Sequence, residues 1–478
     1  MEASEYAVPS IASEFLGAAL GDKRRTQRLL SLAETLSAAP DRPLPRVARD
    51  DAELEALYRF VNNDAVEFGD LLQPHFAATA DRASGYAAAL AIHDITELSF
   101  PVGEERRAGC GSLGQREGFR LAPALVLAGD GSNRPLGLLS AQTWVVDAAR
   151  TKKKGKKKRG NTWGRTDSKG WYGLVEGAEN ALQGQTELIH LGDREAGTYE
   201  MFAWFDRDSR RYVLRLTTNR LVEELDSETG TESELVDITE LAAKLENVVE
   251  VDVSLCRRKA KYLTQRNPPR AARTTRLGFA AKRIRLWRRR ALSRDLPESV
   301  ELNLVVVKEL SPQEGLEPIE WLLATNEPID TPEDIARIVD YYRARWTIEE
   351  FFKALKTGCR IQERQFQTRA ALEKILAIFL VIAWKILEVR TAARTSSDAP
   401  ANTVFTELQL TLLRANPRRR LPPNPTVRDA LLCVAALGGH IKNNGEPGWH
   451  VLARGMERLV ERTVGCLATL QMLGLREK

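Results

Sequence analysis

Two aspartates in this sequence occupy places where a carboxylate could take part in chemistry. Asp94 comes just after the apolar run 88–92, and Asp193 comes just after the apolar run 186–191. Both runs have the length of a strand, and open α/β sheets place their sites at the C-terminal ends of strands. A lone aspartate there is more often a turn residue or a helix cap, so the functional interpretation depends on a third carboxylate.

That third carboxylate lies in the segment 341–356, whose apolar residues recur at intervals of three and four and predict an amphipathic helix. At about 100° per residue, one stripe beside the apolar face holds four polar residues within roughly 60° of one another: Tyr342, Arg345, Glu349 and Lys356. A polar stripe is usually only a solvated face, and Arg345 with Glu349 could be a simple i,i+4 ion pair. Glu350 is the rival carboxylate, but it is rotated by about 100° from the stripe.

Three carboxylates that converge amid basic surface suit two divalent metal ions. We therefore expect two Mg²⁺ ions, with Mn²⁺ able to substitute, on Asp94, Asp193 and Glu349, because Mg²⁺ prefers hard oxygen ligands. One ion would activate water or a 3′ hydroxyl, and the other would stabilise the leaving oxygen. His93 and His190 lie within the two strand segments, where side chains alternate between faces, and we expect them to pack in the core.

The charge distribution favours a polyanionic partner, although the net charge is only +5. A lysine run at 152–159 includes Lys153 and Lys157, and the stretch 257–294 holds fifteen Lys/Arg, among them Arg285 and Arg289, without one carboxylate. The acidic segment 223–250 conceals this asymmetry in the total. A solvated face usually mixes both signs, so stretches of one sign indicate a nucleic acid as partner.

A third basic site is expected near residue 22. Asp22 can cap a helix whose first turns carry Arg24, Arg25 and Arg28 and whose later turns are apolar. These arginines could meet DNA phosphates, although alone they are more often a solvated face.

The elements that must position these residues predict a mixed α/β core. From residue 87 the order is strand, hairpin, helix, strand, helix and strand, with the last strand at 212–216. Short strands then indicate a β-rich insertion at about 217–325, and the chain after 334 is helical. The five cysteines are scattered, the acidic N-terminus is followed by no apolar segment, and the longest apolar run has ten residues, so we expect a cytoplasmic protein that spans no membrane.

At this point the sequence resembles the DDE transposases of the insertion-sequence-four family. The likeness is carried by Asp94 in the segment 91–96, by Asp193 in 193–196, and by the spacing Tyr342-x2-Arg345-x3-Glu349-x6-Lys356. Further similarity lies in 16–22 and 58–62 near the N-terminus, in 321–323, and in 437–439 near the C-terminus. The lysine run is a departure from the family pattern, and 217–300 matches it only loosely.

The resemblance implies a ribonuclease H-like catalytic core and a homodimer that pairs two transposon ends. It implies binding of end and target DNA and cut-and-paste transposition through nicking, a hairpin and strand transfer. Asp94, Asp193 and Glu349 would be the catalytic metal ligands. The resemblance also implies that Tyr342, Arg345 and Lys356 hold phosphates and that Trp321 stacks on a flipped base.

We therefore expect an α/β fold with a β-rich insertion and helical flanks. The expected domains are a DNA-end-binding domain at 1–75, a catalytic domain at 76–390 and a dimerisation domain at 391–478. The expected location is the nucleoid of a bacterial cytoplasm. Two alternatives stay open: a ribonuclease H-like nuclease that does not join strands, and a catalytically silent DNA-binding repressor.

Overall fold

The computed structural model describes residues 11–103, 105–145, 165–216, 220–225, 235–255, 271–313, 318–395, 397–441 and 446–473. The chain forms two compact units. Unit 1 comprises Met1–Ala89, Asp94–Thr186 and Thr347–Lys478, and unit 2 comprises Leu90–His93 and Glu187–Trp346. The expected three-domain division stays a prediction.

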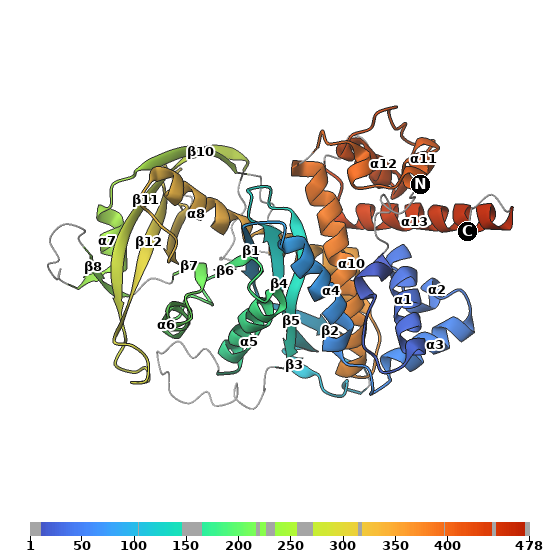
Figure 1. Ribbon diagram of the computed structural model, residues 1–478, viewed down its shortest axis with the longest axis horizontal. Helices are drawn as coiled ribbons and strands as arrows, with labels where there is room; N and C mark the ends of the chain where they lie inside the picture. The colour runs from blue at the N-terminus through green and yellow to red at the C-terminus, as the bar shows by residue number, and fades with distance from the viewer. Residues whose placement is uncertain are drawn as a thin grey trace. The chain divides into compact units, whose positions relative to one another are not determined.

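Unit 1 begins with a group of helices (Figure 1). These are η1 (Ile11–Phe15), α1 (Lys23–Ala38), α2 (Leu44–Val47), α3 (Asp51–Val61) and α4 (Phe68–Ala83). The side chain of Asp22 accepts a hydrogen bond from the Arg24 N–H at 2.8 Å, which confirms the predicted cap of α1. Leu29, Leu32 and Leu36 are buried on one face of α1, and this burial holds the helix in place.

The strands of unit 1 form an antiparallel group around one long strand. They are β2 (Thr96–Phe100), β3 (Gly111–Leu113), β4 (Arg116–Ala128) and β5 (Pro135–Trp144), and each of the others pairs with β4. Helix α5 (Arg165–Leu182), α4 and α10 (Arg369–Thr395) pack against β5. The ten-residue apolar run, at 375–384, is fully buried within α10.

The later part of unit 1 is helical. Besides α10 it holds α9 (Thr347–Lys353), the π-helical turn η3 (Ala354–Gly358), η4 (Ile361–Glu363), η5 (Ala401–Thr403), α11 (Glu407–Arg414), α12 (Val427–Leu437) and α13 (Trp449–Met472). Buried apolar residues of α10, α11, α12 and α13 form one core cluster, which includes Leu413, Val434 and Leu459. None of the helices in the described ranges has the length and hydropathy needed to cross a membrane.

Unit 2 is built on a sheet. Its elements are β6 (Glu187–Gly192), α6 (Tyr199–Arg207), β7 (Arg211–Arg215), β8 (Leu221–Glu224), β9 (Val236–Asp237), α7 (Ile238–Lys244), β10 (Val249–Leu255), β11 (Arg273–Trp287), β12 (Ser299–Glu309), β13 (Glu320–Thr325) and α8 (Pro332–Ala344). The order of neighbouring strands is β6, β7, β13, β12, β11, β8 and β9, and β10 also pairs with β11. Strand β7 runs parallel to β6, and the other pairs among these described strands are antiparallel.

Strand β1 (Ala88–His93) ends in unit 2, where its residues Leu90–His93 belong. His93 and His190 are both buried, and His93 Nε2 lies 2.9 Å from His190 Nδ1, which confirms the prediction of core histidines. Burial, followed by the neighbouring His190, holds the pKa of His93 well below its usual value.

These elements confirm the expected fold class. The succession β1, β4, β5, α5, β6, α6 and β7 follows the predicted order of the mixed α/β core, the strands β8–β13 supply the β-rich insertion, and helices precede and follow them.

One predicted element is wrong: the segment 341–356 is not a single helix. Helix α8 ends at Ala344, where the N–H groups of Arg345 and Trp346 bond to carbonyls three residues back, and α9 begins at Thr347. These i→i−3 bonds tighten the backbone and interrupt the α-helical ladder. The π-helical turn η3 then widens the helix, so the uniform 100° per residue used for the polar stripe does not apply from Tyr342 to Lys356.

Candidate functional site

In unit 1, the structure places Asp94 and Lys356 in one polar neighbourhood. Asp94 directly follows β1, and its Oδ1 accepts a hydrogen bond from the Ile95 N–H at 2.8 Å. Lys356 lies in η3 and donates from Nζ to Thr96 Oγ1 at 2.6 Å. Burial lowers the pKa of Lys356, while the charges of Glu97 and Asp94 oppose that effect. An ammonium held in this way could neutralise an anion that approaches Asp94.

Glu349 lies on α9, in the same unit. Ile348, Phe351 and Phe352 are buried and anchor this short helix, as its apolar pattern predicted, while Glu349 is partly exposed. The neighbouring Glu350 is held by Lys353, whose Nζ donates to Glu350 Oε1 at 3.3 Å, and by two arginines of α10. The two adjacent carboxylates therefore have different surroundings.

In unit 2, Asp193 follows β6 and begins a tight turn. Its Oδ1 accepts from the Glu195 N–H at 2.8 Å, and its carbonyl accepts from the Ala196 N–H at 3.1 Å. Gly197 lets this turn lie directly on β7, because a Cβ at this position would come within 2.4 Å of the Arg215 carbonyl oxygen. The turn fixes the backbone position from which the Asp193 side chain extends.

A cluster of aromatic and basic side chains in unit 2 includes a phenol that senses the charge of Asp193. Tyr342 is 2% exposed, and its ring meets Trp321 edge to face with centroids 5.4 Å apart. Burial raises the pKa of Tyr342, the charges of Arg345 and Arg215 lower it, and the charge of Asp193 raises it again. The phenol therefore lies close to all three charged groups.

Two arginines of this cluster, Arg345 and Arg215, are buried and half-buried respectively. Arg345 is 6% exposed, with its guanidinium carbon 5.8 Å from the Tyr342 ring centroid and 5.0 Å from that of Trp346. Burial lowers the pKa of Arg215, and the neighbouring Tyr342 raises it. The positive charges of Arg194 and Arg345 lower it further, because they repel the charge of Arg215. Clustered cations of this kind suit a phosphate group.

Arg215 is the residue of this cluster that the sequence did not reveal. It ends β7, a strand that was recognised only as an element of the core, and β7 pairs with β13 through Arg215 and Leu323. The available signal was a charged residue at the C-terminal end of β7. Asp193 follows the C-terminal end of β6, which runs parallel to β7, so the two residues lie at the same edge of the sheet.

Trp321 is partly buried rather than fully enclosed. It lies in β13 opposite Val307 of β12, and its ring meets that of Tyr342. The contact with Tyr342 places Trp321 in the same cluster.

The arginines of α1 differ in how far they are engaged. Arg24 Nη2 lies 3.0 Å from Asp22 Oδ2, and Arg25 Nη1 donates to the Leu20 carbonyl at 2.9 Å. Arg28 is exposed on the same helix. Arg24 and Arg28 are thus both exposed, whereas Arg25 is half-buried.

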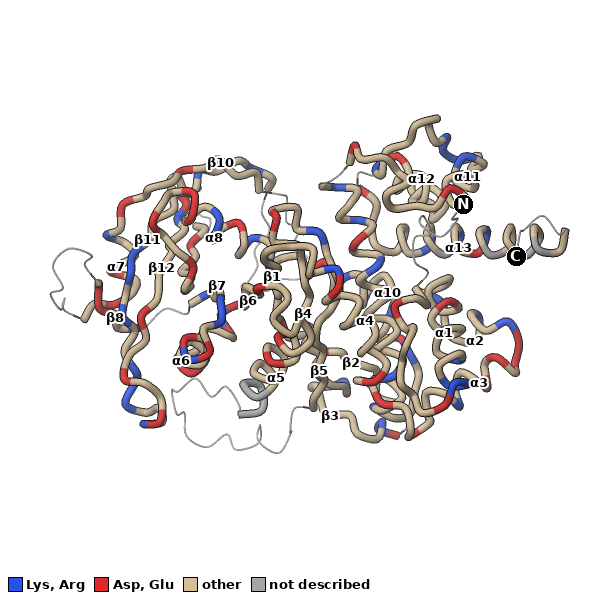
Figure 2. The backbone as a smooth tube through the Cα atoms, viewed as in Figure 1, with Lys and Arg blue, Asp and Glu red and all other residues tan. Residues whose placement is uncertain are grey.

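The basic stretch that includes β11 is paired with acidic strands. Figure 2 shows acidic and basic residues interspersed over this part of unit 2. Arg285 lies 3.3 Å from Glu223 of β8 and 2.7 Å from Glu301 of β12. These ion pairs count against Arg285 as a phosphate ligand, whereas Arg289 lies exposed beyond the end of β11. Lys153 and Lys157 lie outside the described residues.

The chemistry of the predicted ligands fits a hard divalent cation, because all three are carboxylates. Asp94 and Glu349 belong to unit 1 and Asp193 to unit 2. In the part of the chain that the structure describes, no group of three or more His, Cys, Asp or Glu side chains is arranged to hold a metal ion. The metal site therefore stays a prediction.

Comparison with known proteins defines the class. The family model "Transposase DNA-binding" matches residues 10–66, and the family model "Transposase DDE domain" matches residues 138–384. The second match spans more than half of the chain and includes Asp193 and Glu349, whereas Asp94 lies ahead of it. The chain belongs to the DDE transposases, which are DNA-cleaving and DNA-joining enzymes that use divalent metal ions.

One solved structure is also similar to this chain. It is a cryo-EM structure of the piggyBac transposase synaptic complex with hairpin DNA, with a TM-score of 0.37 and 8% identity over 82% of this chain and 74% of that chain. At this TM-score the likeness carries no argument about activity or assembly.

Proposed function

We propose that this DNA transposase moves an element of the insertion-sequence-four family by cutting and pasting. The reaction would proceed through a nick, a hairpin and strand transfer, with Asp94, Asp193 and Glu349 as the catalytic metal ligands. The observation that carries the proposal is the grouping of Asp193, Tyr342 and Arg345 in unit 2. A carboxylate beside a buried phenol and guanidinium supplies both a metal ligand and contacts for a phosphate.

Two Mg²⁺ ions, or Mn²⁺ in their place, would supply an activated water or 3′ hydroxyl and would stabilise the leaving oxygen. The protein's own side chains would position the DNA. Arg345 and Tyr342 would hold phosphates near the cleaved end, and the half-buried ammonium of Lys356 would neutralise charge beside Asp94.

The other parts of the chain would bring DNA to this site. Residues 1–75 would bind transposon ends, with Arg24, Arg25 and Arg28 facing phosphates, and residues 391–478 would form a homodimer in the synaptic complex. Arg289 and the lysine run with Lys153 and Lys157 would add phosphate contacts on end or target DNA, and Arg285 would do so only by exchanging its carboxylate partners. The protein would act at the bacterial nucleoid.

Replacement of Glu349 by glutamine tests the metal ligands. Glu349→Gln is expected to bind end DNA normally but to abolish nicking with Mg²⁺, because an amide is a poorer ligand for a hard cation than a carboxylate. Nicking would be measured on a labelled end duplex by denaturing gel, and DNA binding by gel shift.

Glu350→Gln is the matched control. Glu350 is held by Lys353 and by arginines of α10, so its loss is expected to leave nicking within a few fold of the parent protein. A dead Glu350 variant beside an active Glu349 variant would show that the wrong carboxylate has been assigned. Strand transfer by the cut ends would exclude both a simple nuclease and a silent repressor.

Trp321→Ala tests the hairpin step. Extruding a base costs a few kcal/mol, and stacking on an aromatic ring returns roughly 1–3 kcal/mol. The variant is therefore expected to nick the first strand within a few fold of normal while forming the hairpin about 10 to 100 times more slowly. Single-turnover kinetics on nicked and unnicked ends would separate the two steps.

The contact between Trp321 and Tyr342 supplies the competing explanation, which is packing. Truncation of a core tryptophan typically costs about 3–5 kcal/mol of stability and would slow both steps together. Equal losses in the two rates, together with a lowered melting temperature, would remove Trp321 from the proposed role. Trp321→Phe keeps an aromatic face and is expected to recover most of the hairpin rate.

A further inference from the structure

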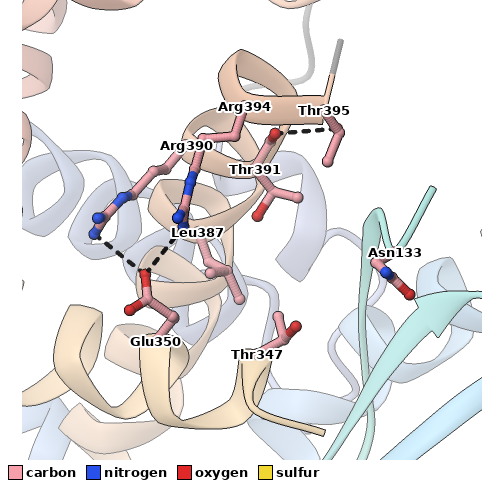
Figure 3. Close-up of a pocket in the computed structure, with 8 residues that line it drawn as sticks. All are labelled: Asn133, Thr347, Glu350, Leu387, Arg390, Thr391, Arg394 and Thr395. Carbon is pink, nitrogen blue, oxygen red and sulfur yellow. Dashed lines mark hydrogen bonds and ion pairs between the residues drawn. The ribbon is translucent and has the colours of Figure 1, made fainter. Parts of the chain in front are cut away.

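A cavity of about 170 Å³ lies in unit 1, on the side of α9 that carries Glu350. Figure 3 shows its lining, which comes from α9, from the last turns of α10 and from Asn133 in the turn between β4 and β5. This volume is far above the roughly 10–15 Å³ that a single water requires, so the cavity has room for a small polyatomic ligand.

Two arginines of the lining converge on one carboxylate oxygen. Arg390 Nη1 lies 3.4 Å and Arg394 Nη1 lies 3.7 Å from Glu350 Oε2 (Figure 3). Within the described ranges, neither Glu350 Oε2 nor Arg390 Nη1 has a hydrogen-bond partner. The contacts are therefore long ion pairs, and one buried N–H group of Arg390 is left without a hydrogen bond there.

The remaining polar groups of the lining can donate hydrogen bonds. Thr347, Thr391 and Thr395 contribute hydroxyl groups and Asn133 contributes an amide, while Glu350 is the one carboxylate among the lining residues. Thr395 is exposed, and its hydroxyl donates to the Thr391 carbonyl at 3.1 Å. An anion would meet an excess of donors here.

Arg390 is held in place before any ligand arrives. Its guanidinium carbon lies 4.1 Å from the ring centroid of Trp449 on α13, and only 17% of its side chain is exposed. Burial lowers the pKa of Arg390, the charge of Glu350 opposes that effect, the charge of Arg394 adds to it, and the charge of Glu446 opposes it again. A bound anion would offset the repulsion between Arg390 and Arg394. Because Arg390 is already held against Trp449, its side chain would lose little freedom on binding.

The geometry points to a binding site for a phosphate group, with Arg390 and Arg394 as its cationic ligands and Glu350 as the internal carboxylate that the phosphate displaces. Guanidinium groups form paired hydrogen bonds with phosphate oxygens, and a phosphate offers more acceptors than the single oxygen the two arginines now share. The site deepens the proposed function if the phosphate belongs to DNA, but it exists independently of cleavage.

Inorganic phosphate tests the site without DNA. Thermal melting of the full chain in sodium phosphate and in sodium chloride, at equal ionic strength and pH, is expected to show a phosphate-specific rise in Tm. Arg394→Gln is expected to weaken phosphate binding about tenfold, the size of a lost charge-assisted hydrogen bond. Thr391→Ala provides a second, smaller truncation in the same lining and is expected to reduce the rise in Tm.

Arg414→Gln is the matched control. Arg414 is an exposed arginine of α11 whose Nη1 lies 3.9 Å from Glu407 Oε2, so its loss changes the net charge equally without touching the cavity. This variant is expected to keep the full phosphate response. Glu350→Gln is expected to bind phosphate about fivefold more tightly, because a competing pair of partly exposed ions has been removed.

Duplex DNA identifies the source of the phosphate. If the DNA backbone supplies it, Arg394→Gln lowers the slope of log affinity against log salt by about 0.9, and Arg414→Gln does not. A phosphate-dependent rise in Tm with an unchanged DNA slope would assign the site to free phosphate. The proposal is overturned if the parent protein melts alike in phosphate and chloride, if Arg394→Gln keeps the whole response, or if Glu350→Gln binds phosphate no better than the parent.

Discussion

Helix α1 and strand β11 are both rich in arginine, but their charges are used differently. On α1, Arg28 stands exposed, and Arg24 is paired only with Asp22, which is its neighbour in sequence. On β11, Arg273 lies 2.5 Å from Glu309, and Arg276 lies 3.0 Å from Glu250 of the neighbouring strand β10.

The difference shows that a basic stretch of sequence is not always a basic surface. A strand pairs with segments that are distant in sequence. The acidic strands β8, β10 and β12 therefore supply the carboxylates that the sequence of β11 itself lacks. Glu309 and Glu223 are almost completely buried, and a buried carboxylate is costly unless a cation and hydrogen bonds accompany it. The main role of the arginines that pair with these carboxylates is therefore to stabilise the folded state.

The largest effect is expected when a buried pair of β11 is broken. Arg273→Ala leaves the side chain of Glu309, which is 0% exposed, with only the Thr275 hydroxyl and the Ile319 N–H as donors. We expect a loss of about 2–3 kcal/mol in the free energy of unfolding, below the roughly 3–5 kcal/mol for a fully unpaired buried charge. Urea denaturation would measure it.

Arg276→Ala serves as its control on the same strand. The side chains of Arg276 and Glu250 are 59% and 43% exposed, so this pair is expected to contribute less than about 1 kcal/mol. If the two variants lose equal stability, burial does not distinguish the ion pairs of β11.

A smaller effect is expected from acid. Burial would raise the pKa of Glu309, but hydrogen bonds from Thr275, the Ile319 N–H and Arg273, together with the charge of Arg273, leave it below its usual value. The unfolded chain therefore takes up this proton first as the pH falls below about 4.5, and stability falls by up to about 1.4 kcal/mol per pH unit for this group. Unfolding curves of the parent and of Glu309→Gln, compared between pH 6 and pH 3.5, would check this, and a parallel pH dependence in both would contradict it.

The smallest effect on stability, and the clearest on DNA, is expected at α1. Arg28→Ala should change the free energy of unfolding by less than about 0.5 kcal/mol, because the side chain is exposed. If Arg28 contacts one phosphate, the slope of log affinity against log salt should fall by about 0.9, with Arg285→Ala changing it less. A larger change for Arg285→Ala would mean that its ion pairs open to admit DNA.

The sequence predicted what depends on neighbours along the chain. The cap at Asp22 and the strands that precede Asp94 and Asp193 each follow from local pattern, and each is present. It could not predict what depends on pairing between distant segments. The partners of Arg285 and the approach of Arg215 to Tyr342 arise from strand register, which no local pattern specifies.

The break at Arg345 and the wide turn at η3 show a second limit. Helical periodicity over 341–356 predicts one helix because apolar spacing survives small changes of winding, whereas the exact facing of polar residues does not. The sequence grouped Tyr342, Arg345, Glu349 and Lys356 as one motif. Tyr342 lies in α8, Arg345 in the break after it, Glu349 in α9 and Lys356 in η3, so the grouping stays a prediction.

The π-helical turn η3 also affects where the chain can tolerate the loss of a residue. A π turn closes its hydrogen bonds over one residue more than an α turn does, as the bond from the Cys359 N–H to the Ala354 carbonyl at 2.9 Å shows. Loss of one codon in 354–358, at the exposed Thr357 for instance, could therefore be absorbed by conversion to an ordinary α turn. The same loss in the buried middle of α10 would rotate every following side chain by about 100°. Length variation among descendants of this gene is thus expected at η3 before it is expected in α10.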